Sequence, residues 1–120
     1  MRELRKVAAM IARAMGFRAN GDLPAARTEI NNAYASLLGP QSDLLRMLDA
    51  ASAARLVGDP KRLISFARLT TAEAALAADE NRQQVGKDLT ARARVFVEEA
   101  LRIDPTNDDA MAALEGLRMK

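Results

Sequence analysis

The sequence predicts an all-α protein, and three observations support this fold class. Of the 120 residues, 49% are hydrophobic but only 3% are aromatic, so any core must be built mainly from alanine and aliphatic side chains. Most of these residue types are good helix formers. Turn signals containing glycine or proline divide the chain at five places, and no stretch shows the alternation of polar and apolar residues typical of strands. We expect about six helices, packed as antiparallel hairpins in one bundle and one domain over residues 1–120.

The first predicted helix spans about residues 3–18 and is amphipathic. Its apolar face carries Leu4, Val7, Ile11, Ala14 and Met15, and its basic face carries Arg2, Arg5, Lys6 and Arg13. One interpretation is a basic helix that binds nucleic acid, an anionic membrane surface or an acidic partner. The other is an ordinary surface helix whose charged side is solvated.

The second predicted helix begins at an Asp22 cap and stops at Gly39-Pro40. Its buried stripe consists of Leu23, Ala26, Ile30, Ala33 and Leu37. Arg27, Asn31 and Tyr34 lie on the shoulder of that stripe and are candidate partner-binding residues, because tyrosines are enriched at protein interfaces. The alternative for Tyr34 is a half-buried ring whose hydroxyl reaches water or a backbone group.

A third helix is predicted over residues 42–57 and a fourth from Pro60 to about Gln83. The fourth is apolar on several sides, as expected of a helix that is central in a bundle or buried in an oligomer. Leu69 and Leu76 lie away from its main stripe, so they are candidate oligomer-interface residues. We expect a homodimer that covers them.

A fifth helix is predicted over about residues 89–103, after a break at Gly86-Lys87-Asp88, and a short sixth follows Asp104-Pro105. We expect the first helix to pair with the second and the fourth with the fifth, with the third as an inserted bridge. If Gly58-Asp59-Pro60 is instead a turn within a hairpin, the third helix pairs with the fourth.

Two segments resemble tetratricopeptide repeats, which are helix-turn-helix units of about 34 residues. In "ARVFVEEALRIDPTN", the spacing of the second helix and its closing proline is kept by Ala93, Val97, Ala100 and Pro105. The same relative spacings are found at Phe17, Gly21, Asp22, Ala26, Ile30 and Ala33. The resemblance implies stacked hairpins that act through protein–protein contacts.

Most of the chain is also similar to a family of small bacterial helical proteins known only as a domain of unknown function. The positions that carry this likeness are Gly21, Asp22, Ala26, Glu29, Ile30, Ala33, Tyr34, Leu37, Leu38, Gly39, Asp43, Leu44, Leu45, Leu48, Asp59, Pro60, Arg62 and Leu63. The likeness implies a shared fold and supplies no activity.

The residue types argue against catalysis. The chain has no cysteine and no histidine, which excludes thiolate nucleophiles, thiolate metal sites and imidazole bases. The acidic pairs Asp79-Glu80 and Glu98-Glu99 are adjacent on helices, where successive side chains diverge by about 100°. We therefore expect no enzyme activity, no cofactor and no metal site.

We expect a non-catalytic interaction or scaffold module that self-associates and binds an unknown protein or peptide. The alternative is an accessory protein that uses its basic first helix on nucleic acid or an anionic membrane. A net charge of +2 makes a dedicated nucleic-acid binder unlikely. No apolar run approaches the roughly 20 residues of a membrane span, so we expect a cytoplasmic protein.

Overall fold

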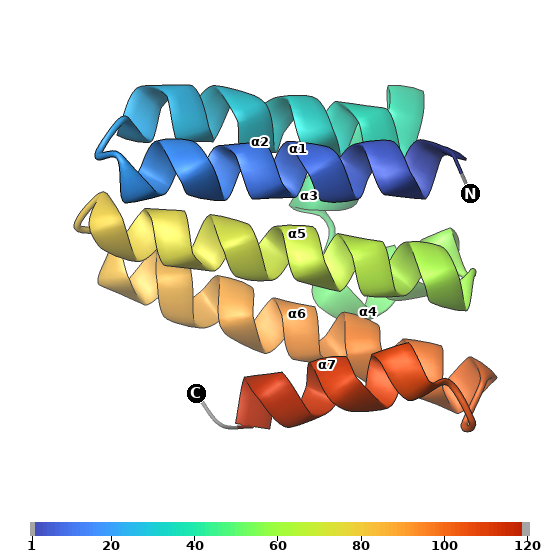
Figure 1. Ribbon diagram of the computed structural model, residues 1–120. Coiled ribbons are helices and arrows are strands. Elements are labelled where there is room, and N and C mark those ends of the chain that lie inside the picture. The colour runs from blue at the N-terminus through green and yellow to red at the C-terminus, as the bar shows by residue number, and fades with distance from the viewer. Residues whose placement is uncertain (1, 119–120) are drawn as a thin grey trace.

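The structure, a computed structural model, describes the backbone of residues 2–118 and the side chains of residues 3–118 (Figure 1). This part of the chain forms α1 (Arg2–Ala19), α2 (Leu23–Leu38), the 3-10 helix η1 (Gly39–Gln41), α3 (Ser42–Met47), α4 (Ala50–Val57), α5 (Pro60–Asp79), α6 (Gln83–Ile103) and α7 (Asp108–Arg118). The predicted all-α fold class is confirmed.

The helices are arranged as two antiparallel hairpins with a bridge between them. α1 packs along α2, and α5 packs along α6, as the sequence predicts. η1, α3 and α4 connect α2 to α5, and α7 packs on α5 and α6. α1, α5 and α7 lie side by side on one face of the molecule and run in the same direction (Figure 1).

Aspartate caps begin three of the helices. The carboxylate of Asp22 accepts a hydrogen bond from the backbone N–H of Ala25, and Asp59 accepts one from Arg62. Asp49 does the same for Ser52 at the start of α4. Each carboxylate satisfies one of the free N–H groups that every helix start leaves unpaired.

The predicted third helix is two helices. The backbone of Leu48 is extended, with ψ 156°, and α4 begins anew after the Asp49 cap. No glycine or proline marks this break, which is why the periodicity of residues 42–57 missed it. The break turns the bridge, so that α4 packs against α6.

The turn between α5 and α6 is also displaced from its predicted place. It lies at residues 80–82, where Asn81 has a φ of 63°, so Gly86 is inside α6 rather than at a turn. A Cβ atom at Gly86 would lie 3.0 Å from the carbonyl oxygen of Ala74 on α5. The glycine therefore permits a close approach of two helices.

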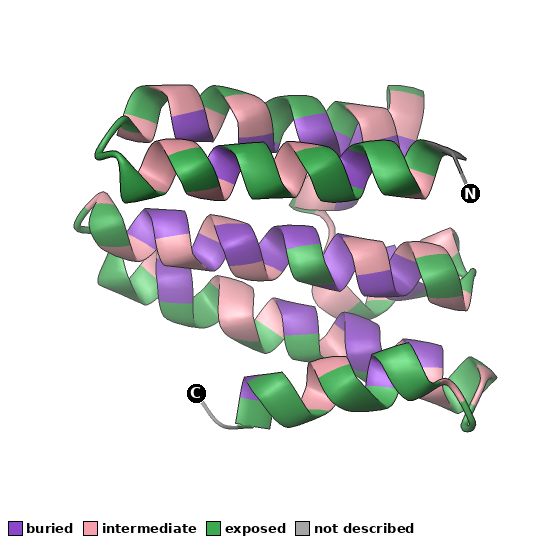
Figure 2. Ribbon diagram, in the orientation of Figure 1, coloured by how far each residue is buried: buried purple, intermediate pink, exposed green. Residues whose placement is uncertain are grey.

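α5 is the centre of the core and is buried over most of its length (Figure 2). Leu69 and Leu76 are both 0% exposed within this single chain. The prediction that they form an oligomer interface is wrong, because α1, α2, α6 and α7 all contact α5 and cover its several apolar sides. The radius of gyration of 13.3 Å agrees with the value of about 13.6 Å expected for one compact domain of this length.

None of the helices in the described residues is both long enough and apolar enough to cross a membrane.

Candidate functional site

Two of the three predicted partner-binding residues, Tyr34 and Arg27, contact one glutamate of this same chain. The hydroxyl of Tyr34 donates a hydrogen bond to Glu73 Oε1 at 2.6 Å and lies 3.3 Å from the hydroxyl of Thr70. Arg27 Nη1 lies 2.8 Å from Glu73 Oε2, and its Nη2 lies 2.7 Å from Glu80. α2 therefore joins α5 through a polar cluster.

Arg46 of α3 completes this cluster from the bridge. Its guanidinium lies 3.9 Å from the centroid of the Tyr34 ring, and its Nη2 is 3.5 Å from Glu73 Oε2. Its Nη1 donates to the side-chain oxygen of Asn31, which is exposed. A cation over an aromatic face is attracted by the ring quadrupole, so Arg46 holds α3 against α2.

Tyr34 is 2% exposed, so its predicted role as an anchor for an external partner is wrong. Burial, reinforced by the charge of Glu73, raises the pKa of the Tyr34 phenol well above its usual value. Burial alone would lower the pKa of Arg27, but its hydrogen bonds to Glu80 and Glu73 outweigh this and raise it. The phenol stays neutral and the guanidinium stays charged, which suits a structural cluster and not proton transfer.

A further arginine fixes the bridge from the other side. Arg92 of α6 donates to the backbone carbonyls of Leu45 and Leu48 at 2.7 and 2.6 Å. These carbonyls lie at the end of α3, where helix carbonyls have no partner within the helix. Burial lowers the pKa of Arg92 from its ordinary value. Nothing in the sequence spacing signals this role.

The predicted basic face of α1 is divided in the structure. Arg5 and Lys6 are exposed, and Arg13 is exposed with one guanidinium nitrogen 3.6 Å from Glu29. The side chain of Arg2 lies outside the described residues. Arg5 differs from the other described members because it lines a groove.

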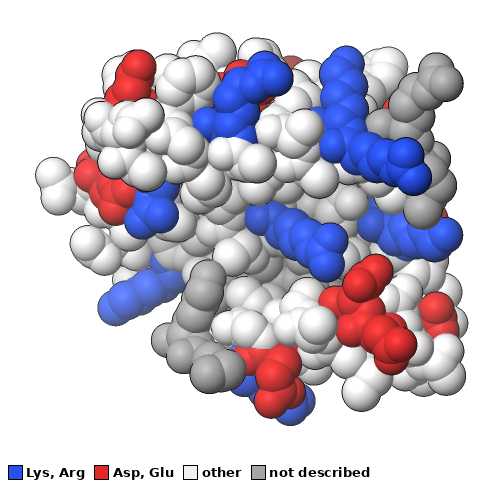
Figure 3. Space-filling view, in the orientation of Figure 1, with Lys and Arg blue, Asp and Glu red and all other residues white. Residues whose placement is uncertain are grey.

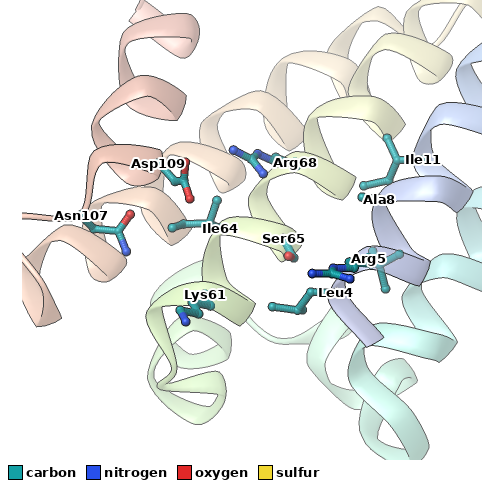
Figure 4. A pocket seen from close by; sticks show the side chains of 11 residues that line it. Leu4, Arg5, Ala8, Ile11, Lys61, Ile64, Ser65, Arg68, Asn107 and Asp109 are labelled. Atoms are coloured by element: carbon teal, nitrogen blue, oxygen red, sulfur yellow. The ribbon is translucent and has the colours of Figure 1, made fainter. Parts of the chain in front are cut away.

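That groove, of about 280 Å³, lies on the face where α1, α5 and α7 run side by side (Figure 4). We call it the front groove. Its lining is apolar toward α1 and at Ile64 of α5, with polar and charged side chains around it. The residues that line it are Leu4, Arg5, Val7, Ala8, Ile11, Lys61, Ile64, Ser65, Arg68, Asn107 and Asp109.

The charge of the front groove is uneven. Arg5, Lys61 and Arg68 lie on its α1 and α5 walls, and within the described residues none of them forms an ion pair. Asp109, in the first turn of α7, is the acidic side chain of the opposite wall. On this face, Lys and Arg side chains spread over α1 and α5, and Asp and Glu side chains lie over α7 and at the left edge (Figure 3).

Sequence reasoning identified Arg5 but missed Lys61 and Arg68. These two residues are seven positions apart on α5 and so project from the same side of that helix. The seven-residue spacing is visible in the sequence, but the solvated side of any amphipathic helix shows the same pattern, so it does not single out these two cations. That α1 and α7 flank this side follows only from the packing.

In the part of the chain that the structure describes, no group of three or more acidic side chains is placed to hold a metal ion. The acidic pairs are used internally instead: Asp79 pairs with Arg18, and Glu99 pairs with Arg102. What the front groove can do chemically is bind, through an apolar surface and three cations.

Comparison of the chain with protein-family models, with curated proteins and with solved structures finds no match.

Proposed function

We propose that this protein is a non-catalytic interaction module that holds a segment of a partner protein in the front groove. The observation that carries the proposal is the combination of an apolar lining with cations that are not neutralised by described neighbours. These cations are exposed, so water solvates them in the free protein, and cations of one sign beside an apolar groove favour an acidic occupant through charge complementarity.

The residue types of the chain also favour an interaction role. The chain contains neither histidine nor cysteine, and the tyrosine hydroxyl is engaged by Glu73. The resemblance to tetratricopeptide repeats agrees with the proposal, since such hairpins present one face of parallel helices to their partners. It remains a resemblance, and the proposal depends on the groove.

A matched pair of substitutions tests the proposal. Ala8 is exposed on α1 and lines the front groove, whereas Ala12, one turn further along, is exposed and does not line it. Peptides selected from a random displayed library on the wild-type protein should lose binding to Ala8→Trp, because the indole fills the groove. They should keep binding to Ala12→Trp. Circular dichroism of both variants controls for folding.

Two results would contradict the proposal. One is that the selected peptides bind Ala8→Trp as well as they bind the wild type. The other is that no peptide is enriched over an unrelated helical protein at micromolar concentration.

The second candidate is an accessory protein for an anionic surface, and the basic side chains on the face in Figure 3 favour it. Lys6 and Arg13 extend the basic surface of α1 beyond the groove. In this case, Lys6→Gln/Arg13→Gln should weaken binding to single-stranded DNA or to vesicles containing phosphatidylserine. Binding should also fall steeply with salt, because it would release counterions. Ala8→Trp should have no effect on it.

The sequence predicted a homodimer because Leu69 and Leu76 were expected to be exposed. Both are buried within the single chain, so they do not support self-association. The homodimer stays a prediction that sedimentation at micromolar concentration tests. A 13.0 kDa species that does not change on concentrating would contradict it.

A further inference from the structure

We infer that the front groove takes an extended acidic segment that carries two carboxylates three residues apart and an apolar side chain between them. This inference rests on the proposed function and narrows the class of partner. It follows from the spacing of the cations on α5, the apolar surface of the α1 wall, and the charges of the α1 and α7 walls.

The spacing comes from α5. Lys61 and Arg68 both line the groove and are seven residues apart on one helix. At 1.5 Å of rise per residue, their Cα atoms are about 10 Å apart along the helix axis. In an extended polyproline II segment, side chains three residues apart project to the same side and are about 9 Å apart. Two carboxylates at that interval therefore match the two cations.

An extended segment fits better than a helical one. A helical ligand would also place side chains about 10 Å apart at positions i and i+7, but only two turns of it would contact α5 between Lys61 and Arg68. Isolated helices of that length are only marginally stable in water, because the first hydrogen-bonded turn is costly to form. A polyproline II segment has no internal hydrogen bonds, so it does not require this nucleation step.

In a polyproline II segment, the side chains between the two carboxylates point to the sides, and one of them points toward α1. Ile64 lies between Lys61 and Arg68 along α5 but is only 4% exposed. Leu4 and Ile11 lie across the groove on α1 and are half-buried, so each still offers apolar surface to a side chain that points to α1 (Figure 4). Covering this surface contributes affinity, and the two charge pairs set the register.

The α1 and α7 walls have opposite charges. Arg5 adds a third cation on the α1 wall and strengthens the attraction for a carboxylate, whereas Asp109 opposes it from α7. Asn107 also lines the α7 end, but its side-chain oxygen accepts the N–H of Ala110. We therefore expect carboxylates to face α1 and α5 and to lie away from α7. Removing the charge of Asp109 should strengthen binding.

The test uses eight-residue peptides with blocked termini, equal composition and two glutamates separated by two, three or four positions around one leucine. Fluorescence anisotropy should give the lowest Kd for a separation of three. Lys61→Gln and Arg68→Gln should each raise that Kd about tenfold, because each removes a charge-assisted contact. Asp109→Asn should lower it.

Lys6→Gln is the matched control, since it removes one positive charge from an exposed site on α1 that does not line the groove. It should change the Kd less than about twofold, as expected of a screened surface charge. The inference is overturned if the three peptides bind equally, if none binds, or if Lys6→Gln weakens binding as much as Lys61→Gln.

Failure of this inference can be told apart from failure of the proposed function. If the peptide library selects neutral or basic sequences that Ala8→Trp abolishes, the groove binds peptides and the acidic motif is wrong. If no selected peptide is sensitive to Ala8→Trp, both the function and the motif are wrong.

Discussion

At the scale of single residues, Glu73 organises more of the structure than any other side chain in its cluster. It accepts from Tyr34 and pairs with Arg27 and Arg46, which come from α2 and α3. Only 12% of its side chain is exposed, and Tyr34 beside it is 2% exposed, so water has little access to the tyrosine hydroxyl if the carboxylate is removed. Tyr34 and Arg27 were recognisable in the sequence as unusual. Their partner was not, because it lies 39 positions beyond Tyr34 and helical periodicity says nothing about such distant pairs.

Glu73→Ala should lower the free energy of unfolding by about 3 kcal/mol, because it leaves the buried Tyr34 hydroxyl without its acceptor and removes one of the two carboxylates that Arg27 pairs with. Tyr34→Phe should cost only about 1–2 kcal/mol, since one hydrogen bond is lost and the ring packing against Phe66 is kept. Urea denaturation measures both. Equal losses in the two variants would show that Glu73 is not the centre of the cluster.

At the scale of helices, two glycines within helices have opposite roles. Gly86 lies where a Cβ atom would meet the backbone of α5, whereas a Cβ atom at Gly16 in α1 would meet nothing within 4 Å. The sequence could not separate the two. Gly86 was interpreted as a turn, and only the packing of α5 on α6 shows why a glycine is needed inside a helix.

Gly16→Ala should raise the free energy of unfolding by about 0.5–1 kcal/mol through higher helix propensity. Gly86→Ala gains the same propensity but crowds the carbonyl of Ala74, and overpacking costs about 1–3 kcal/mol. We expect a net loss in Gly86→Ala. Thermal unfolding of the two variants should therefore shift the midpoint in opposite directions, and shifts of the same sign would contradict the close approach.

The Asp49 cap makes the stability of α4 depend on pH. Hydrogen bonds from the side chain and backbone of Ser52 hold the pKa of Asp49 below its usual value. The pKa of Asp49 is lower in the folded state than in the unfolded state, where it is about 4. The cap therefore contributes its full stability above about pH 4 and loses it as the pH falls through the folded-state pKa.

Asp49→Asn keeps an acceptor at this position but cannot titrate there. The difference in unfolding free energy between wild type and Asp49→Asn, measured at pH 7 and at pH 2, should shift in favour of the variant at low pH. A difference that is the same at both pH values would mean that the cap is not coupled to protonation.

At the scale of the whole molecule, the bundle places three parallel helices on one face (Figure 1). The front groove lies between them. The fold class and the pairing of the two hairpins followed from turn signals and apolar stripes. The sequence also shows that α5 is apolar on several sides, but the expected reason, a dimer interface, is not the one found. Leu69 and Leu76 are covered by neighbouring helices of this chain and not by a second copy.

The front groove itself could not be predicted from the sequence. Its walls come from α1, α5 and α7, and Arg5, Lys61 and Asn107 are brought together only by tertiary packing. Each wall taken alone looks like the solvated side of an amphipathic helix. The functional interpretation of these cations therefore depends on the arrangement of the helices and not on any local motif.

The front groove as a peptide-binding site is the central claim, and mapping of amide chemical shifts by NMR tests it most directly. On titration with the blocked peptide whose glutamates are three positions apart, the largest shifts should fall in residues 4–11, 61–68 and 107–109. The exposed apolar side chains Leu44, Met47 and Leu56 of α3 and α4 offer the main alternative surface. Shifts that centre on residues 44–56, or no shifts at millimolar peptide, would contradict the claim.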